Sequence, residues 1–466
     1  MVALRADALE PAAVYGHAHP FPSVSWDWTD SCTYFLTWIM PEVDAVTLDA
    51  RQELDRVGTA DIVLGILSYN NAATIAQVIR NAQDGLAAAF PASRSVIVHA
   101  DGGSKDGTPN LALEAAVDQS TLVQVAYPVY PVHRLSPDYH GIPGKGNAVR
   151  AVFELAQTLQ AKACVAMDAD ISGFTPQWTE ALVRPVLENQ FDLISPYYLR
   201  HKYEGTVING IVYPLMRALY GKRIRQPIGA DFAYSAKLIG HCLQQPQWDS
   251  DVTGPGIDAW ITTGAIAAGF KLAQAFLGPR TQSHSDPPPQ LSSALAQVLE
   301  SLFTGMNRMA SIWQRLRGSE PVPAFGVDLR AVAESPAADV HPMIESFQLG
   351  YRNLQEVWGV VLPPATLLEL KKLAARSDDG FRFPDTLWAR IVYDFALAHR
   401  TRAMDRNHLL QAMTPLYLGW VASYALQVRD ADALGVEQRI EALCMAYEAE
   451  KGYLISRWRW PDRFNP

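Results

Sequence analysis

The sequence predicts an α/β fold in which a parallel β-sheet is covered by helices and is followed by a mainly helical C-terminal region. Short runs rich in β-branched residues alternate with helical runs from about residue 58 to residue 290. This alternation is typical of a parallel sheet with helices on both faces. Longer amphipathic runs with helical spacing follow a proline-rich stretch, "SHSDPPPQ". We therefore expect an N-terminal extension at 1–57, an α/β domain at 58–290 and a helical domain at 291–466.

The N-terminal extension contains the aromatic runs "WDWTD" and "TYFLTWIM" and the helix-like run "DARQELDRV". Trp and Phe at this density are uncommon in disordered tails, so we expect the extension to be packed. The first residues lack a basic stretch followed by an apolar core. No apolar run reaches the roughly 20 residues that span a bilayer. The sequence therefore favours a cytoplasmic enzyme with no membrane span.

Four β-rich runs define the expected sheet: "DIVLGILSY", "SVIVHADGG", "TLVQVAYPV" and "KACVAMDAD". Helical runs separate them, and a turn-rich loop, "SPDYHGIPGKGN", precedes the helix before the fourth strand. In parallel sheets ligands bind at the carboxyl ends of the strands. Polar clusters stand at these expected ends, namely Ser68–Asn71, Asp101–Asp106, the Gly144–Asn147 loop, and Asp168 with Asp170.

Composition and charge exclude several classes of protein. The chain of 466 residues is 49% hydrophobic and 19% charged, which is typical of a soluble globular protein with enough material for more than one core. A net charge of -9 and the absence of Lys/Arg runs argue against a protein that binds nucleic acid or an anionic membrane. The four cysteines, Cys32, Cys164, Cys242 and Cys444, are too widely spaced for a disulfide framework or a zinc site, and we expect them to be reduced and buried.

The run "ACVAMDADISGF" places two carboxylates, Asp168 and Asp170, at the end of an expected strand. Side chains at i and i+2 of an extended segment point to the same side, so both carboxylates are directed to one place. Mg²⁺ and Mn²⁺ prefer oxygen ligands and are commonly held by one or two carboxylates together with phosphate oxygens. The alternative interpretation is that "DAD" caps the next turn, because Asp is a common turn residue.

Two further loops combine glycine with polar side chains. "DGGSKDGT" opens a helix, where glycines let backbone N–H groups approach a ligand and Asp101 can accept hydrogen bonds from a base or ribose. A hairpin-like turn is the alternative interpretation. "IPGKGNAV" places Lys145 before a helix, in a position to hold phosphate or sugar hydroxyls, or to be a solvated loop residue. Its spacing differs from that of a phosphate loop of the G-x-x-x-x-G-K-[ST] type, which argues against an ATPase.

The order of these motifs resembles a known group of enzymes. The series "GILSYNNAATIAQVI", "ADGGSKDGT", "IPGKGNA", "AMDADISGFTPQW", "QPIGADFA", "GPGIDAWITT" and "RTQSHSD" is similar to that of the retaining glucosyl-3-phosphoglycerate synthase and mannosylglycerate synthase families. These are A-type nucleotide-sugar glycosyltransferases. The resemblance covers about residues 60–290 and implies a single Rossmann-like nucleotide-sugar-binding domain. It also implies a hexosyltransferase that uses Mg²⁺ or Mn²⁺ and a UDP- or GDP-hexose donor.

The resemblance implies roles for individual residues. Asn71 and Ser104 would lie against the nucleotide, together with Ser68 of the first polar cluster. Asp101 would contact the base or ribose, and Lys145 the base and the donor diphosphate.

The same resemblance implies the metal ligands. Asp170 would bind the metal directly, with Asp168 beside the ribose or the metal. His284 in "RTQSHSD" would complete the metal site through its imidazole. Without the order of motifs, His284 would read as an ordinary polar loop residue.

Three positions concern the sugar and the acceptor. Asp231 in "QPIGADFA" stands where the families usually carry Glu, and Asp258 in "GPGIDAW" matches an acidic acceptor-side position; either could instead be a cap or turn residue. Thr206 stands where phosphoglycerate-specific enzymes carry an Arg, which removes a bidentate phosphate clamp. Arg200, His201 or Lys202 could compensate. We expect a small polar acceptor, with glycerate at least as suitable as 3-phosphoglycerate.

The expected reaction is transfer of glucose or mannose with retention, in which the metal neutralises charge on the departing diphosphate and that phosphate takes the acceptor's proton. The retaining stereochemistry is implied by the resemblance. One rival is a sugar nucleotidyltransferase, which lacks support because "SYNNAAT" stands where its long Gly-rich loop would be. The other is a catalytically silent nucleotide-sugar-binding or scaffold protein. We expect the helical region to pack on the catalytic domain and to support a homodimer.

Overall fold

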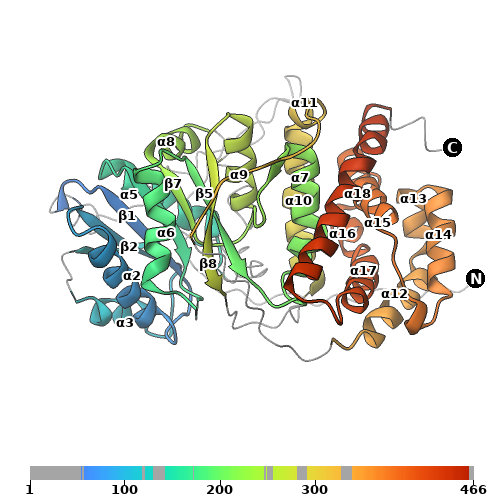
Figure 1. Ribbon diagram of the computed structural model, residues 1–466, viewed down its shortest axis with the longest axis horizontal. Helices are drawn as coiled ribbons and strands as arrows, with labels where there is room; N and C mark the ends of the chain where they lie inside the picture. Colours follow the sequence, from blue (N-terminus) through green and yellow to red (C-terminus); the bar gives the residue numbers. More distant parts are fainter. Residues whose placement is uncertain are drawn as a thin grey trace, which may run out of the picture. The chain divides into compact units, whose positions relative to one another are not determined.

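The structure is a computed structural model that describes residues 57–117, 121–127, 142–171, 173–245, 256–280, 291–326 and 338–460, with Leu54, Val129 and Trp248. All of them belong to one compact unit, residues 45–466. Figure 1 shows an α/β part in blue to yellow-green and helices in yellow to red. The aromatic runs expected in the N-terminal extension and the proline-rich stretch lie outside the described residues.

The described residues form one eight-stranded sheet with the order β10-β8-β5-β7-β4-β1-β2-β3. Its strands are β1 Ile62–Ser68, β2 Ser95–Asp101, β3 Leu122–Ala126, β4 Ala163–Asp168, β5 Leu193–Leu199, β7 Phe232–Ser235, β8 Leu272–Pro279 and β10 Ala324–Phe325. Only β7 among them pairs in antiparallel fashion, with β4 and β5. The remaining pairs are parallel. The predicted fold class, a mainly parallel sheet in an α/β domain, is confirmed.

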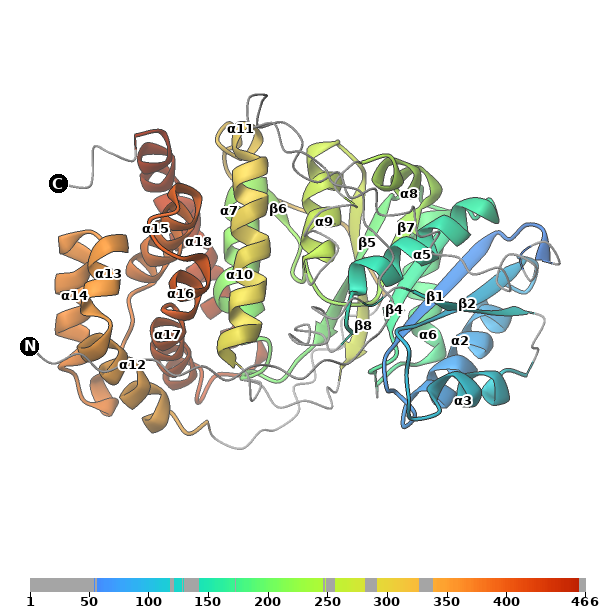
Figure 2. The same cartoon turned by 180° about the vertical axis from the view of Figure 1, so that it is seen from behind.

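Helices cover both faces of this sheet. They are α2 Ile75–Ala89, α3 Thr108–Ala115, α5 Lys145–Thr158, α6 Pro176–Leu187, α8 Ala236–Leu243 and α9 Ile257–Ala267. Alternate side chains of β1 serve the two faces: Ile62 and Leu64 pack with α2 and α6, whereas Val63 and Leu67 pack with α5 and α8. This period of two follows from strand geometry. Figures 1 and 2, which view the sheet from opposite sides, show α2 and α6 over one face and α5 and α9 over the other.

Gly65 of β1 lets helix α5 approach the sheet closely. A Cβ atom at this position would lie 2.5 Å from Cγ1 of Val152, a distance that no packed carbon pair adopts. Glycine is therefore required here by packing rather than by backbone conformation. The close approach fixes α5, whose first residue is Lys145.

The second core is built from helices. They are α10 Leu291–Arg308, α11 Ala310–Trp313, α12 His341–Asn353, α13 Gln355–Val361, α14 Pro364–Ala374, α15 Asp385–Thr401, α16 Arg406–Gln411, α17 Thr414–Gln427 and α18 Ala433–Arg459, with a short 3₁₀ turn at Asp378–Gly380. Fully buried Trp358, Trp388 and Trp420 lie in this core. The helical C-terminal region is as the sequence predicts.

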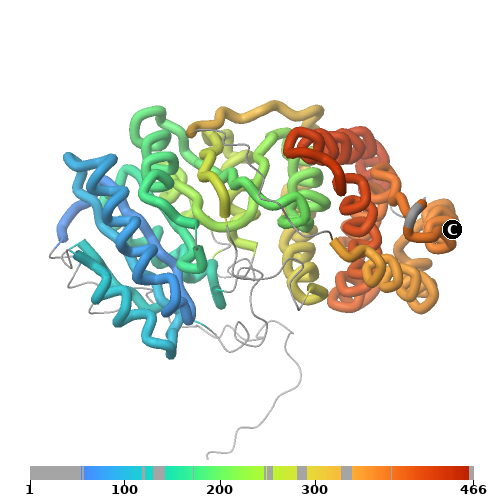
Figure 3. The backbone as a smooth tube through the Cα atoms, turned by 60° about the horizontal axis from the view of Figure 1, so that its bottom comes forward, coloured from blue at the N-terminus to red at the C-terminus, as the bar shows by residue number. Residues whose placement is uncertain are grey.

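The chain passes between the two cores in both directions. A π-helix at Ile208–Val212 and helix α7, Tyr213–Tyr220, come from the middle of the α/β part and pack in the helical core. Figure 3 shows this green segment beside the red helix α18. In the other direction, strands β9 and β10 follow helix α10 in the chain but pair with strands of the α/β part. Strand β10 pairs with β8 at the edge of the sheet, and β9 (Glu320–Pro321) pairs with β6 (Lys222–Arg223). A domain boundary at residue 290 therefore stays a prediction.

Gly210 in the π-helix marks the tightest point of this contact. A Cβ atom there would lie 2.2 Å from Cζ3 of Trp420. The carbonyl of Gly210 accepts hydrogen bonds from Nε1 of Trp388 at 2.8 Å and from the hydroxyl of Tyr447 at 3.0 Å. Single-turn π-helices often stand at functional positions, and here the extra turn anchors the segment that follows strand β5.

The cysteines and the lengths of the helices bear on two simpler expectations. Cys164, Cys242 and Cys444 are free thiols and buried, as predicted, whereas Cys32 lies outside the described residues. None of the helices in the described ranges has the length and apolar character needed to cross a membrane.

Candidate active site

Three neighbouring strands bring polar side chains to the same edge of the sheet. Ser68 at the end of β1 is in register with Asp101 at the end of β2, and Leu67 is in register with Asp168 at the end of β4. Because these strands are parallel, their carboxyl ends meet at one edge, as the sequence predicts. We call the polar residues at this edge the candidate active site.

Asp101 organises the first half of this edge. Its carboxylate accepts hydrogen bonds from the backbone N–H groups of Gly103 and Ser104 at 2.9 and 2.8 Å. It also accepts from the hydroxyls of Ser104 at 2.6 Å and Ser68 at 2.8 Å. With both oxygens occupied, Asp101 holds the glycine-rich loop in shape and is not free to contact a base or ribose in this conformation.

The loop after β1 is tied to its neighbours on both sides. The backbone N–H of Asn70 donates to the hydroxyl of Ser104 at 2.8 Å, and that of Asn71 donates to Oγ1 of Thr108 at 2.8 Å. The hydroxyl of Thr74 donates to the carbonyl of Ala169, between the two aspartates, at 2.7 Å. Asn71 and Ser104 remain partly exposed at this rim, where a ligand could contact them.

A buried histidine, His99, forms a hydrogen bond with Ser68. Nε2 of His99 lies 2.8 Å from the hydroxyl of Ser68, and Nδ1 lies 3.2 Å from the amide nitrogen of Gln124. Burial lowers the pKa of His99 from 6.5 to about 4, although the negative charge of Asp101 acts in the opposite direction. His99 is therefore neutral at pH 7 and acts as a hydrogen-bonding support.

Lys145 is the centre of the second half of the edge. It is buried at the first turn of α5, after Gly144 in a left-handed conformation with φ of 67°. Its Nζ donates to the carbonyl of Gly229 at 2.6 Å and lies 3.2 Å from Asp258 and 3.3 Å from Asp168. The loop-lysine interpretation of the sequence is thus wrong: Lys145 is an internal cation that joins β4, the β7 loop and α9.

The charges around Lys145 influence one another. Burial lowers the pKa of Lys145, but the attraction of Asp168 and Asp258 outweighs it, so the net shift of its pKa is upward. Burial raises the pKa values of Asp168 and Asp258, and Lys145 offsets part of this change. A single lysine therefore compensates two buried carboxylates only in part.

Asp231 lies directly before the antiparallel strand β7. Because β7 runs opposite to β4 and β5, its amino end lies at the same edge as their carboxyl ends. Asp231 is fully buried and has a φ of 68°, in the left-handed region that favours glycine. One oxygen accepts the hydroxyl of Tyr198, and the other accepts the backbone N–H of Asp168 at 3.3 Å. Burial raises the pKa of Asp231 to about 6, although Arg280 acts to lower it.

Arg280, directly after β8, faces this cluster from the other side. Its guanidinium lies 3.9 Å from Asp231 and 5.0 Å from the ring centre of Tyr198. Nε and Nη1 are buried and have no hydrogen-bond partner among the described residues. A buried guanidinium with spare donors is costly unless an anionic group satisfies it.

The described residues of the site carry an excess of carboxylates. Asp168, Asp231 and Asp258 are buried, and Asp170 is half-exposed next to them, so four carboxylates face the two cations Lys145 and Arg280. When all six groups are ionised, the excess is two negative charges. Oδ1 of Asp168 is buried and lacks a hydrogen bond, although it lies near Lys145. Carboxylate oxygens in this setting suit Mg²⁺ or Mn²⁺.

The described residues alone do not supply a complete metal site. Within these ranges, no three His, Cys, Asp or Glu side chains come together as metal ligands. The further ligand that the family resemblance implies, His284, lies outside the described residues. The role of Asp170 as a direct ligand therefore stays a prediction.

The structure brings most of the predicted site residues to one edge. Ser68, Asp101 and Ser104 form one hydrogen-bonded group, and Lys145, Asp168, Asp231 and Asp258 form the other. Sequence reasoning missed His99, Tyr198 and Arg280 as parts of the site. Arg280 is the first residue of the quoted run "RTQSHSD", so its position at a strand end was the signal available; nothing in the sequence pattern singled out His99 or Tyr198.

Thr206, where the sequence departs from the family pattern, is buried and its hydroxyl lies 2.6 Å from that of Tyr417. It therefore joins α17 in the helical core. Nearby, Arg200, His201 and Lys202 line a cavity of about 390 Å³ between the end of β5 and α18. The buried Nε2 of His201 has no hydrogen-bond partner among the described residues.

Comparisons with known proteins give a likeness of fold. No model of a known protein family matches the chain. None of the curated proteins matches it either. Similar solved structures include glucosyl-3-phosphoglycerate synthase from Mycobacterium tuberculosis in complex with phosphoglyceric acid, which is 21% identical over 56% of this chain and 84% of that chain, with a TM-score of 0.39. The same enzyme in complex with Mg²⁺ and uridine-diphosphate is 20% identical over 56% and 83%, with a TM-score of 0.41.

Proposed function

We propose that this chain is a metal-dependent glycosyltransferase that moves a hexose, glucose or mannose, from a UDP- or GDP-sugar to a small hydroxylated acceptor such as glycerate or 3-phosphoglycerate. The observation that carries the proposal is the buried charge cluster of Lys145, Asp168, Asp231, Asp258 and Arg280 at the carboxyl edge of the sheet. The order of motifs in the sequence supports it. Burying so many charges is costly, and a site that handles charged phosphates gives a reason for that cost.

The partly exposed residues of the rim are proposed to contact the donor. Asn71 and Ser104 offer an amide and a hydroxyl to the nucleotide. Asp170, with Asp168 and His284, would hold Mg²⁺ or Mn²⁺. When bound, the metal neutralises negative charge on the departing diphosphate.

The buried residues are proposed to act as supports. Lys145 holds Asp168 and Asp258 in place, and Asp231 fixes the backbone of Asp168 through its N–H group. The spare donors of Arg280 are suited to a diphosphate oxygen. A direct contact of Asp231 or Asp258 with donor hydroxyls would require these carboxylates to become exposed.

The reaction proposed is a same-face substitution at the anomeric carbon. The bond from that carbon to the diphosphate oxygen breaks, the bond to the acceptor oxygen forms, and the acceptor's proton passes to the leaving diphosphate. We propose that the acceptor enters beside Arg200, His201 and Lys202. Their cavity lies at the end of β5, and Tyr198 of the same strand binds Asp231.

The proposal is tested by measuring nucleoside diphosphate release from UDP-glucose, GDP-glucose and GDP-mannose with Mg²⁺ or Mn²⁺. Each donor is offered with glycerate, with 3-phosphoglycerate and without an acceptor. Release that an acceptor stimulates, with an α-configured product from an α-configured donor by NMR, supports the proposal. Tight binding of a nucleotide-sugar without any release would favour a binding protein instead.

A further inference from the structure

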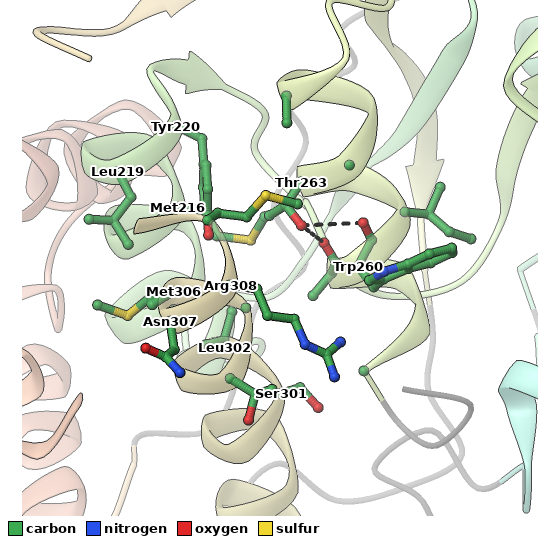
Figure 4. A pocket seen from close by; sticks show the side chains of 18 of the residues that line it. Met216, Leu219, Tyr220, Trp260, Thr263, Ser301, Leu302, Met306, Asn307 and Arg308 are labelled. Atoms are coloured by element: carbon green, nitrogen blue, oxygen red, sulfur yellow. Dashed lines mark hydrogen bonds between the residues drawn. The ribbon is translucent and has the colours of Figure 1, made fainter. Parts of the chain in front are cut away.

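A large cavity outside the candidate active site lies between helices α9 and α10. Its volume is about 890 Å³, and helix α7 contributes to its wall. Figure 4 shows apolar side chains on one side of it, among them Met216 and Leu219 of α7 and Leu302 and Met306 of α10. Pockets of roughly 300–1,000 Å³ hold small organic ligands. Methionine side chains adapt readily to apolar ligands of irregular shape.

Helix α9 separates this cavity from the candidate active site. Asp258 faces Lys145, and the hydroxyl of Thr262 donates to the carbonyl of Pro227 at 3.0 Å. Trp260 and Gly264 line the cavity instead. Residues at i and i+4 share a helix face, so the two sites use different faces of one helix.

The charge of the cavity is opposite to that of the whole chain. Its described lining includes Arg308, Arg400 and Arg406, and Glu300 is the only carboxylate in that described lining. Glu300 already pairs with Arg406 at 3.3 Å and with His399 at 2.7 Å. Arg308 has no ion-pair partner within the described residues, and Figure 4 shows it between α10 and Trp260. The cavity is therefore electropositive although the chain carries a net charge of -9.

Two further donors face the cavity without a partner. Tyr220 is 3% exposed, and its hydroxyl makes no hydrogen bond to any residue that the structure describes. The indole N–H of Trp260 likewise has no acceptor in the described ranges. Both groups line the cavity, so a ligand held there can supply an acceptor to either of them. Arginine, tyrosine and tryptophan donors together select an acceptor that is anionic.

We propose that the cavity between α9 and α10 binds a small amphipathic anion, an apolar chain or ring that ends in a carboxylate or a phosphate. The apolar part lies among Met216, Leu219, Leu302 and Met306. The anionic end lies at Arg308, on the side of the cavity that Trp260 lines. This site is separate from hexose transfer and its occupation does not depend on the function proposed above.

The test is isothermal titration calorimetry of the full chain with decanoate and with decyl phosphate, both below their micelle concentrations. Decyltrimethylammonium, which has the same chain and the opposite charge, is the ligand control. Arg308→Gln removes the unpaired cation, and Arg315→Gln is its matched control at an exposed position outside the cavity. Gly264→Leu fills the cavity, since a Cβ atom there meets nothing within 4 Å; Gly359→Leu is the equivalent change elsewhere.

We expect one anion to bind per chain, with the preference between the two probes identifying the head group. Arg308→Gln should weaken binding at least about tenfold, and Gly264→Leu should abolish it, while both control variants bind as the unmodified chain does. Circular dichroism checks that each variant is folded. The proposal is overturned if neither anion binds, if the cation binds as well as the anions, or if Arg308→Gln or Gly264→Leu binds normally.

Discussion

Replacing Lys145 with methionine removes a buried ammonium group from Asp168, Asp258 and the carbonyl of Gly229. Methionine keeps the unbranched shape of the side chain, so packing changes little and the lost charge dominates. Removing one partner of a buried ion pair costs about 3–5 kcal/mol, because the remaining charge stays buried without compensation. We expect Lys145→Met to lower the free energy of unfolding by about that amount. Adding Asp258→Asn should restore about 1–2 kcal/mol of it, since one uncompensated carboxylate is removed.

The measurement is urea unfolding at pH 7, followed by tryptophan fluorescence and circular dichroism, with midpoint and slope fitted together. Lys162→Met is the matched control. Lys162 is 71% exposed and pairs with Asp61 at 2.8 Å on the surface, where such a pair contributes about 0–1 kcal/mol. A loss for Lys145→Met no larger than that for Lys162→Met would refute the view that Lys145 compensates the buried carboxylates.

Three other substitutions probe separate parts of the account. His99 is buried and neutral, and its pKa of about 4 lies below the 6.5 of an exposed histidine. Lowering the pH from 7 to 5 protonates His99 in the unfolded chain only, so the free energy of unfolding should fall by about 2 kcal/mol. His99→Gln should lose this part of the pH dependence. Equal pH dependence in both proteins would contradict a buried, neutral His99. Gly210→Ala should cost about 1–3 kcal/mol by forcing a methyl group against Trp420, whereas Gly359→Ala should be neutral or slightly stabilising; melting temperatures compare the two. Arg280→Lys keeps the charge but loses the planar donor fork, and kcat/KM should fall about tenfold or more, so unchanged kinetics would exclude a role for Arg280 at the diphosphate.

The strands of the sheet and the edge that carries the site could be predicted from the sequence. The run "DIVLGILSY" gave the strand Ile62–Ser68, because apolar β-branched residues end at a polar cluster. The parallel alternation then requires the ends of β1, β2 and β4 to lie at one edge, which places Asp101 and Asp168 on the two strands that flank β1. The local residue pattern and the order of strands and helices are therefore enough to predict these strands and the edge at which the site lies.

The environment of Lys145 could not be predicted in the same way. Its partners Asp258 and Gly229 lie 113 and 84 residues away along the chain, and no local pattern links them. The helix starts at Lys145 itself, three residues before the predicted run, because Gly144 adopts the left-handed conformation that permits the turn. The sequence alone therefore allows a solvated loop lysine, whereas in the fold Lys145 is buried at the centre of the site.

The antiparallel strand β7 also escaped the sequence analysis. It has only four residues, and no strand is assigned to "QPIGADFA" from the sequence, which matches Asp231 to a family position or to a cap or turn residue. The strand lies between β4 and β5 and runs antiparallel to both, an arrangement that leaves no periodic signal in the sequence. The position of residues 206–220 in the helical core could not be predicted either, because their apolar side chains would suit the core of the sheet as well as that of the helices.

The central claim is that the carboxylates at the end of β4 serve metal-dependent hexose transfer. Its most direct test compares nucleoside diphosphate release by the unmodified chain, by Asp170→Asn and by Asp84→Asn, an exposed control on α2, with Mn²⁺ or Mg²⁺ and after chelation with EDTA. The account predicts acceptor-stimulated release that EDTA removes, that added metal restores, and that Asp170→Asn lowers at least about a hundredfold while Asp84→Asn leaves it unchanged. Release that persists in EDTA, or that is equal in Asp170→Asn and Asp84→Asn, would contradict it.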